Sequence, residues 1–260
     1  MSKTDSPRID VHRYARIVKT APSGFEPFND DTFLIARRGT LSQYWCPSEH
    51  LPGNARIAIV GITPGHEQAT NIFRAFQKSL LAGQDIADAL RTAKLAGSFS
   101  GPMRANLVRM LDSIGLPKKL GMATCVSLFE PANELAHFTS ALRYPVFVGG
   151  KNYNGIPPML NVDILRRSIE TYLAAEASSL ANVVWLPLGP KPTLALTHLA
   201  SIGVIDPNKI FEGLPHPSGA NAERVAFFLG KKSKADLSPM TRPEPIEAAR
   251  EMLVERVGRL

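Results

Sequence analysis

The amino-acid sequence predicts an α/β fold, a three-layer αβα sandwich around a mostly parallel central sheet of about four strands. Short apolar runs that end at glycine or proline alternate with longer stretches in which apolar residues recur every three or four positions. Parallel strands need long crossover connections, and the helices between them supply these. Because there is no internal repeat, we expect a single domain over 1–260, with a core at about 56–230, an N-terminal arm at 1–55 and a C-terminal extension with a helix at 231–260.

The first core strand is the β-branched run 56–61, which glycine stops, as is typical of a buried parallel strand. Further core strands are expected at 122–129, 182–189 and 210–214. In the arm, Pro, Gly, Asp and Ser interrupt residues 20–54, where only 33–36 has the pattern of a short strand. The stretch 145–158 contains an apolar run at 146–148 and then a turn-rich loop that we expect to be exposed.

The clearest helix is predicted at 66–81, where Ala69, Ile72, Phe73, Phe76 and Leu80 repeat with the period of an amphipathic helix. The other predicted helices are 9–19, 103–114, 162–180, 192–201, 221–229 and 245–257. Only a tight turn separates the strand at 56–61 from the helix that follows it.

Charge and cysteine content narrow the classes of function. The formal net charge of +7 and the pI near 9.5 favour an anionic partner, of which DNA is the commonest large example, although an ordinary basic enzyme is the alternative. The two cysteines, Cys46 and Cys125, are too few for an iron-sulfur cluster or a structural zinc site, so we expect no metal and no cofactor. The polar start of the chain and the absence of a long apolar run predict a monomeric cytoplasmic protein, nucleoid-associated in a bacterium, with no membrane contact.

Two loops follow predicted strands at the edge where open parallel sheets bind their ligands. The loop 61–67 has the sequence GITPGHE, in which two glycines permit close approach of the backbone and proline fixes the turn. The loop 214–221 has the sequence LPHPSGAN, in which prolines on both sides restrict the backbone of His216. Taken alone, the first loop fits a structural turn and the second fits a solvent-exposed histidine.

Together, and in this order, the GITPG and HPS loops resemble the two signature motifs of the uracil-DNA glycosylase superfamily. Residues 99–101 (FSG) and 107–116 (LVRMLDSIGL) look like the region after the first motif in the iron-sulfur, thermophile-type group, and 186–189 (LPLG) matches a strand of that group. The similarity covers about residues 56–230. That group holds its cluster with four cysteines, and this chain has two.

The resemblance implies a uracil-DNA glycosylase-like fold and a monofunctional hydrolase that removes uracil from DNA and leaves an abasic site for base excision repair. Cleavage of the N-glycosidic bond makes the sugar positive and the departing base negative, so both must be stabilised and a water placed, after the base has been flipped out of the helix. By resemblance, His216 donates a hydrogen bond to O2 of the departing uracil. Phe99 matches the aromatic residue that stacks on the flipped base, although a core phenylalanine is an equal alternative.

The remaining positions of the two loops and their surroundings are expected to hold the nucleotide and the strand. The substrate-binding residues are expected to be Gly61, Ile62, Pro64, Gly65, Phe99, Cys125, Asn152 and Asn154. The DNA-binding residues are expected to be Pro217, Ser218, Gly219, Asn221 and Arg224. Residues 219–221 lie where relatives insert an apolar wedge into the base stack, but they are small here, so we expect Arg224 or a residue of another loop to fill that position.

Two positions depart from the family pattern. Thr63 stands where relatives have aspartate or asparagine; it can orient a water but cannot act as a general base, so Glu67 is preferred over His66 as the group that takes the proton. Cys125 stands at the position of the base-reading asparagine, and a thiol is a poor bidentate reader. Asn152 or Asn154 is expected to read the base instead, with broader specificity that extends to hypoxanthine, xanthine or mismatched bases.

Two other classes of function compete with an active glycosylase. The same fold could be kept as a weak or inactive module that binds damaged or single-stranded DNA; retention of His216 favours the enzyme, because a binding module needs no group that stabilises a leaving base. A nucleotide or ester hydrolase should carry a phosphate loop or a Gly-x-Ser-x-Gly elbow, and neither occurs. No lysine lies in either loop, so a Schiff-base lyase step is not expected.

Overall fold

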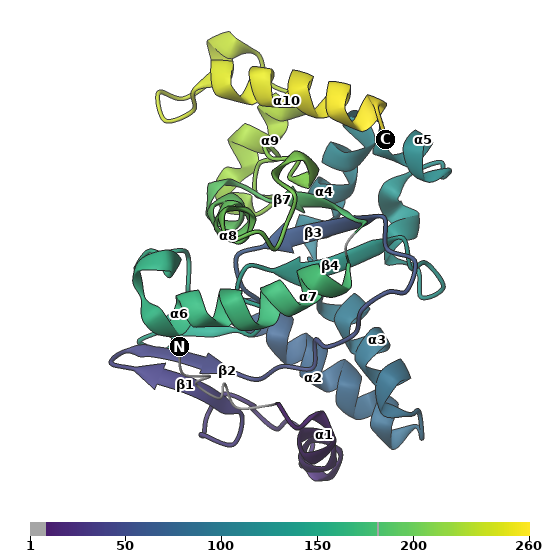
Figure 1. Ribbon diagram of the computed structural model, residues 1–260, viewed down its shortest axis with the longest axis vertical. Helices are drawn as coiled ribbons and strands as arrows, with labels where there is room; N and C mark the ends of the chain where they lie inside the picture. Colours follow the sequence, from purple (N-terminus) through teal and green to yellow (C-terminus); the bar gives the residue numbers. More distant parts are fainter. Residues whose placement is uncertain (1–8, 181) are drawn as a thin grey trace. The chain divides into compact units, whose positions relative to one another are not determined.

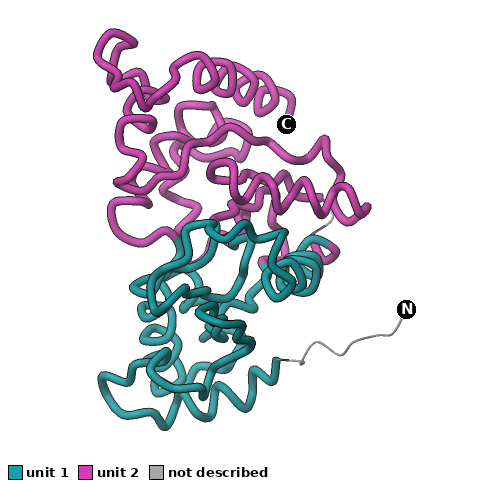
Figure 2. Tube along the Cα trace, turned by 90° about the vertical axis from the view of Figure 1, so that its left-hand side faces the viewer, with its two compact units in different colours: residues 1–51, 62–98, 140–177 teal, residues 52–61, 99–139, 178–260 magenta. Residues whose placement is uncertain are grey.

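The computed structural model describes residues 9–180 and 182–260 as a mixed α/β structure with two separate sheets (Figure 1). The chain forms two compact units, coloured separately in Figure 2: unit 1 comprises 1–51, 62–98 and 140–177, and unit 2 comprises 52–61, 99–139 and 178–260. Each unit is thus assembled from three segments of the chain. The single domain stays a prediction, and residues 1–8 of the predicted arm lie outside the described residues.

The sheet of unit 2 has the strand order β4-β3-β7, with bounds β3 Ile57–Gly61, β4 Ala136–Ser140 and β7 Val184–Pro187. β3 and β7 are parallel and wholly buried, in agreement with two predicted strands. The predicted strand at 210–214 pairs with the β7 region at only two points, the parallel bridges Trp185–Ile210 and Leu188–Leu214. The parallel part of the predicted sheet is therefore present, in a shorter form.

The prediction of a strand at 122–129 is wrong. Residues Cys125–Phe129 form a 3-10 helix, η1, in which Cys125 and Leu128 are both buried. Their spacing of three residues matches the three residues per turn of a 3-10 helix. The strand at this point of the topology is β4, which begins eleven residues after Cys125.

The helices of unit 2 occur close to the predicted positions. They are α4 Pro102–Ser113, α5 Leu116–Leu120, α8 Pro190–Ser201, α9 Ala222–Phe228 and α10 Pro243–Gly258, with 3-10 turns η4 Pro207–Lys209, η5 Gly219–Asn221 and η6 Lys234–Asp236. Proline lies in the first turn of α4, α8 and α10, where its missing N–H costs no helical hydrogen bond. No helix among the described residues is long and apolar enough to cross a membrane.

Helix α10, the predicted C-terminal helix, packs against the segment that leads to His216. A Cβ atom at Gly213 would lie 2.7 Å from Cβ of Ala249, so only glycine allows the two backbones to come this close. The guanidinium of Arg256 donates hydrogen bonds to the carbonyl oxygens of Ile210 and Asn208 and lies 4.0 Å from the ring centre of Phe211. The C-terminal extension therefore supports the residues just before the HPS loop.

The sheet of unit 1 was not predicted as a sheet. It has the order β1-β2-β5-β6 with antiparallel pairing, and its bounds are β1 Leu34–Arg38, β2 Leu41–Tyr44, β5 Val146–Val148 and β6 Lys151–Asn152. Gly149 and Gly150, both with positive φ, form a two-residue turn between β5 and β6, as the twist of a tight hairpin requires. The expected loop at 149–155 therefore begins as a hairpin.

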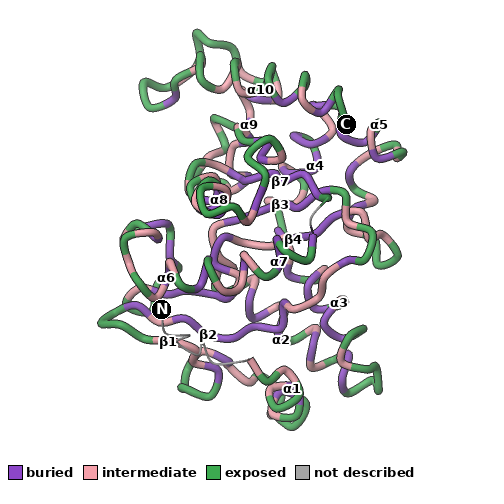
Figure 3. The backbone as a smooth tube through the Cα atoms, viewed as in Figure 1, coloured by how far each residue is buried: buried purple, intermediate pink, exposed green. Residues whose placement is uncertain are grey.

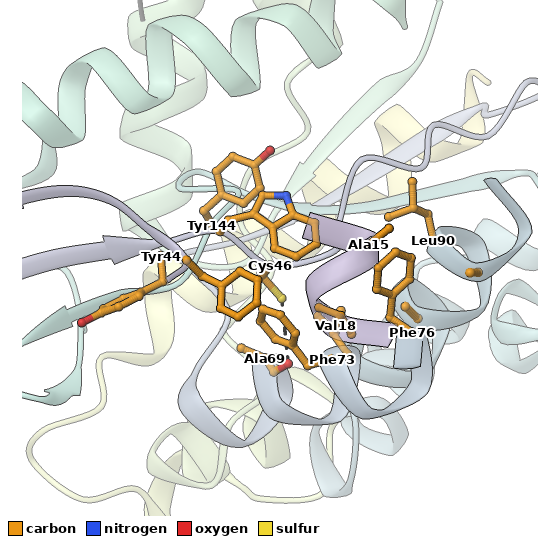
Figure 4. Packing of buried hydrophobic residues seen from close by; sticks show 14 of the residues in the cluster. Ala15, Val18, Tyr44, Cys46, Ala69, Phe73, Phe76, Leu90 and Tyr144 are labelled. Atoms are coloured by element: carbon orange, nitrogen blue, oxygen red, sulfur yellow. Dashed lines mark hydrogen bonds between the residues drawn. The ribbon is translucent and has the colours of Figure 1, made fainter. Parts of the chain in front are cut away.

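The helices of unit 1 surround an aromatic core. They are α1 Val11–Thr20, α2 His66–Leu81, α3 Ile86–Gly97 and α6 Asp163–Ser168, followed by the π-helical turn η3 Ile169–Leu173 and α7 Ala174–Ser179, which runs into unit 2; the 3-10 turn η2 is Met159–Asn161. Helix α2 has the predicted bounds, and its apolar stripe packs into the cluster drawn in Figure 4, with Trp45 and Tyr144. Figure 3 shows the buried and exposed faces along the chain.

Candidate functional site

The ends of three parallel segments meet at one edge of unit 2. The amide of Leu188 donates to the carbonyl of Val60 at 2.9 Å, and the amide of Gly189 donates to the carbonyl of Leu214 at 2.8 Å. Gly189 has φ +87°, and a Cβ atom there would lie 3.7 Å from Cβ of His216. The HPS loop thus starts at the carboxyl ends of the strands, as the sequence predicts, beside the loop that follows β7.

His216 is held in one defined hydrogen-bonding state. Its Nδ1 accepts a hydrogen bond from the amide of Ser218 at 3.3 Å, so Nδ1 carries a lone pair and Nε2 carries the proton. Burial lowers the pKa of His216 below its usual value of 6.5, which keeps the ring neutral at pH 7. The side chain therefore presents a single neutral N–H donor.

A chain of hydrogen bonds continues from this loop through the predicted DNA-binding residues. The side-chain oxygen of Ser218 accepts from Asn221 at 3.2 Å, and the side-chain oxygen of Asn221 accepts from Arg224 at 2.9 Å. Pro217 is buried, whereas Gly219 is exposed. The structure thus connects Ser218, Asn221 and Arg224 in one network.

Asn106 on α4 also holds the HPS loop, a contact that the sequence analysis did not predict. Its side-chain amide donates to the carbonyl of Pro217 at 2.9 Å across 111 positions of sequence. A contact between residues so far apart has no local signature. Because both prolines and Asn106 fix the backbone, His216 is restrained from several sides.

Phe99 lies in unit 2 and is buried, with its ring in an edge contact with Phe138 at 6.1 Å. It is the one described residue other than glycine with positive φ, +48°, a conformation that costs of order 1 kcal/mol or more and needs support from its surroundings. Phe138 stacks on Phe129, and the guanidinium of Arg104 lies 4.5 Å from the Phe129 ring centre.

In unit 1, the GITPG loop is fixed by backbone groups of 140–146. The hydroxyl of Thr63 donates to the carbonyl of Tyr144 at 3.0 Å and accepts from the amide of Val146 at 3.2 Å. The carbonyl of Ile62 accepts from the amide of Leu142. The Thr63 hydroxyl has one acceptor position left, so it can receive a hydrogen bond from a water but has no second proton to donate.

Asn152 caps the start of α2. Its side-chain oxygen accepts from the amide of His66 at 2.8 Å, and the amide of Gly65 donates to the side chain of Gln68 at 3.2 Å. A Cβ atom at Gly65 would lie 3.4 Å from the Asn152 side chain, so the two residues are in close contact. Side chains of the protein therefore occupy the amides of Gly65 and His66, and Asn152 is left with its NH2 group as donor.

The two candidates for the group that activates water are both exposed. Glu67 lies in the first turn of α2, where the helix dipole favours a carboxylate. The ring of His66 packs against Phe28 and Phe147, with ring centres 5.3 and 5.9 Å away. Pro64 is half-buried in the same turn.

Cys125 and Asn154, the other residues predicted to read the base, make hydrogen bonds within other segments of the chain. Cys125 is buried in η1, its amide donates to the carboxylate of Asp112 at 2.7 Å, and burial raises its thiol pKa. Because the strand expected at 122–129 is absent, the strand register that placed Cys125 at the base-reading position no longer holds. Asn154 is exposed, and its side chain accepts from the amide of Ile156 within its own loop.

Metal binding has no evident site in the described part of the chain, where no three His, Cys, Asp or Glu side chains gather as a metal ion would need. Cys46 and Cys125 are both free thiols. The HPS loop of unit 2 offers a neutral histidine with hydroxyl and amide groups, and the turn at the start of α2 in unit 1 offers a hydroxyl, an amide and an exposed carboxylate.

Comparison with known proteins gives one clear relationship. No family model matches the chain, and no solved structure matches it. The uncharacterized protein YoxB of Bacillus subtilis (strain 168) is 32% identical over 209 residues, which cover 79% of this chain and 82% of YoxB. An identity of this size over most of both chains means that the protein belongs to the same family as YoxB.

Proposed function

We propose that this protein is a monofunctional DNA glycosylase that hydrolyses the N-glycosidic bond of uracil, and of other deaminated bases, and leaves an abasic site. The observation that carries the proposal is the state of His216. A backbone amide occupies Nδ1, and burial keeps the ring neutral, so Nε2–H is its free donor. The order of the GITPG and HPS loops supplies the second support.

A neutral donor suits the departure of a base as an anion. As the bond from C1′ of the sugar to the base nitrogen breaks, both electrons go to the base, and the negative charge is shared between its ring nitrogens and its carbonyl oxygens. A fixed N–H donor stabilises that charge without having to reorient during the reaction. In this proposal Nε2–H of His216 donates to O2 of uracil, while Asn106 and the two prolines keep the ring in place.

Water completes the reaction by attacking C1′ and losing a proton. In this proposal Glu67 accepts the proton of the water, as the sequence suggests. The water is oriented by a hydrogen bond that it donates to the last acceptor position of the Thr63 hydroxyl. The flipped base must be one whose edge an NH2 donor can bind, because the oxygen of Asn152 is already used. That favours deaminated bases, which carry a carbonyl oxygen where cytosine and adenine carry an amino group.

The test is excision from labelled oligonucleotides that contain one uracil, single-stranded or opposite guanine, followed by alkaline cleavage of the abasic site. We expect the wild type to yield abasic product and His216→Gln to lose about 100-fold or more in rate. His198→Gln, a change on α8 of the same unit, is the matched control and should retain activity. Glu67→Gln and His66→Ala in the same assay identify the group that takes the proton.

The outcomes separate the possibilities. Full activity of His216→Gln contradicts the mechanism, and full activity of Glu67→Gln contradicts only that assignment. A wild type that binds these oligonucleotides but releases no base is a DNA-binding protein without glycosylase activity, and the proposal is then wrong.

A further inference from the structure

We propose that Asn106 and Arg109 of α4 are positioning residues that strengthen the N–H donor of His216 through a continuous series of hydrogen bonds. The inference rests on the proposed function and deepens it, because it adds two side chains outside both motif loops to the same site. All groups of the series lie in unit 2, where α4 packs beside α9, the helix that follows the HPS loop (Figure 1).

A single peptide group connects α4 with the ring of His216. Its carbonyl oxygen, on Pro217, accepts a hydrogen bond from the side-chain amide of Asn106 at 2.9 Å. Its N–H, on Ser218, donates to Nδ1 of His216 at 3.3 Å. The carbonyl and the N–H lie at opposite ends of one rigid plane, so a hydrogen bond at the first end fixes the direction of the second. Asn106 therefore aims the N–H at the histidine ring.

Arg109 extends the series to the surface of α4. Its guanidinium donates through Nη2 to the side-chain oxygen of Asn106 at 2.6 Å and through Nε to the carbonyl of Ala105 at 3.2 Å. A guanidinium can only donate and a carbonyl can only accept, so Asn106 must turn its oxygen to Arg109 and its NH2 group to Pro217. Arg109 thus selects the one orientation of the Asn106 amide in which the bond to the HPS loop forms.

Every hydrogen bond of the series donates in the same direction. The series begins at the Arg109 guanidinium, passes through the Asn106 amide and the peptide group, and ends at Nε2–H of His216. Aligned hydrogen bonds polarise one another, and the cation at the start draws electron density away from the ring. Nε2–H thereby becomes a stronger donor to a base that leaves with negative charge.

The same bonds influence the protonation of the histidine. A donor that points at Nδ1 opposes the addition of a proton there, and so acts in the same direction as burial, which lowers the pKa of His216. Arg109 is exposed, and water screens its direct field, so its effect depends on the bond to Asn106. The pKa of His216 should therefore respond to both α4 residues, whether or not base excision is measured.

The experiment compares the wild type with variants that interrupt the series at two points. Asn106→Ala removes the amide, whereas Asn106→Asp keeps its size but places an oxygen against the Pro217 carbonyl. Arg109→Met removes the donor and its charge, and Arg109→Lys retains both. Lys118→Met is the matched control, because it removes an exposed charge of α5 in the same unit that is not part of the series.

Two readouts are taken for each protein after circular dichroism has shown that it is folded. The first is the single-turnover rate of uracil excision at saturating enzyme, together with the enzyme concentration that gives half of this rate. The second is the pKa of His216 from NMR titration of protein with isotope-labelled histidine, in which His216→Gln assigns the signal. Arg109 is exposed, so its variants test the proposal even if the Asn106 variants do not fold.

We expect the two Asn106 variants to lower the saturating rate about tenfold and Arg109→Met to lower it about threefold, with the half-saturating concentration within about twofold for Asn106→Ala. In all three the pKa of His216 should rise toward 6.5. Arg109→Lys and Lys118→Met should match the wild type in rate and in this pKa.

Several results would overturn the proposal. They are an unchanged pKa in Asn106→Ala and Arg109→Met, a pKa that responds to Asn106→Asp alone and so to its added charge, and equal effects of Lys118→Met and Arg109→Met. A rate that falls while the pKa stays constant would likewise refute polarisation of the ring. If the pKa of His216 follows the expected order in a protein that excises nothing, the series is supported and the glycosylase is refuted.

Discussion

His216 shows how burial and one backbone hydrogen bond define the chemistry of a residue. The ring is partly buried, its pKa is lowered by desolvation, and the Ser218 amide selects the tautomer. A histidine in water at neutral pH exchanges between forms, whereas this one offers one donor in one direction. The same burial has a measurable effect on stability, because the unfolded chain binds a proton more readily than the folded one.

We expect that protonation of His216 destabilises the folded protein. Its pKa is lower in the folded state than in the unfolded state, so its contribution is fully present well above pH 6.5 and is lost as the pH falls from 6.5 through the lowered value. Chemical denaturation at several pH values should therefore show that wild-type stability falls more steeply below pH 6.5 than that of His216→Gln. Parallel curves for the two proteins would show that the histidine is not desolvated in the folded state.

Lys94 is another basic side chain whose pKa is lowered by burial. Its ammonium is fully buried and donates to the carbonyls of Ser48 at 3.0 Å and His50 at 2.7 Å. Desolvation lowers its pKa to about 8, against the opposing attraction of Glu176 and Glu49, while Arg143 adds to the lowering. The Lys94 ammonium connects the arm to α3 within unit 1. It therefore has a structural role, and its burial makes the charged form less favourable than in water.

We expect stability to increase with pH above 8 because of Lys94. Between about pH 8 and 10.5 the unfolded chain holds a proton that the folded chain has lost, so the free energy of unfolding rises by up to about 1.4 kcal/mol per pH unit. The stability difference between wild type and Lys94→Met, measured by urea denaturation at pH 7 and pH 10, should shift in favour of the wild type. A difference that stays constant over this range contradicts the buried-lysine explanation.

At the scale of elements, the sequence predicted what depends on local patterns. Helix α2 was predicted with its observed bounds because its apolar residues repeat over 16 residues, and β3 because a β-branched run ends at glycine. Strand β4 has the sequence AHFTS, which shows no such pattern. Its buried residues include the polar His137, so the strand was not recognisable as an apolar run. The apolar run at 122–129 instead winds into a 3-10 helix because its Cys125 is tied by its amide to Asp112.

The residues of the candidate site also divide into those that a local sequence pattern predicted and those that it did not. The HPS loop is contiguous, so its restraint by proline and its position after a strand are readable from the sequence. The bond from Asn106 to Pro217 and the bond from His66 to Asn152 join residues 111 and 86 positions apart. Tertiary folding brings these residues together, so local sequence patterns carry no information about them.

The Asn152 contact predicts an element-scale effect on α2. Gly65, the N-cap residue, has no side chain to bind the free amides, so Asn152 does this from β6. Asn152→Ala should lower the free energy of unfolding by about 1 kcal/mol, the usual cost of losing a cap, and Asn152→Asp should retain most of it. Denaturant unfolding measures both, with Asn154→Ala as the control that removes only a bond within its own loop. A larger loss in Asn154→Ala than in Asn152→Ala would contradict the capping role.

At the scale of the whole molecule, the net charge of +7 determines how the protein meets DNA before any base is recognised. Each basic side chain that neutralises a phosphate releases a counterion, so the logarithm of the affinity falls linearly with the logarithm of salt concentration. In our proposal Arg224 and Arg242 are among these side chains, because both are exposed in the basic segment 219–242. Arg224 also donates to the carbonyl of Met240 in the loop between α9 and α10, whereas Arg242 follows the buried Thr241.

We therefore expect Arg242→Gln to weaken binding to an abasic duplex and to reduce the slope of log affinity against log salt by about 1, with no dependence on sequence. Arg224→Gln should reduce the slope similarly, because it also removes an exposed positive charge of this segment. Arg16→Gln, which removes an exposed charge of α1 in unit 1, is the control and should leave the slope unchanged. Fluorescence anisotropy at 50 to 200 mM salt decides among these outcomes. If Arg16→Gln reduces the slope as much as Arg242→Gln does, the DNA is bound by overall charge, and the segment 219–242 has no special part in binding.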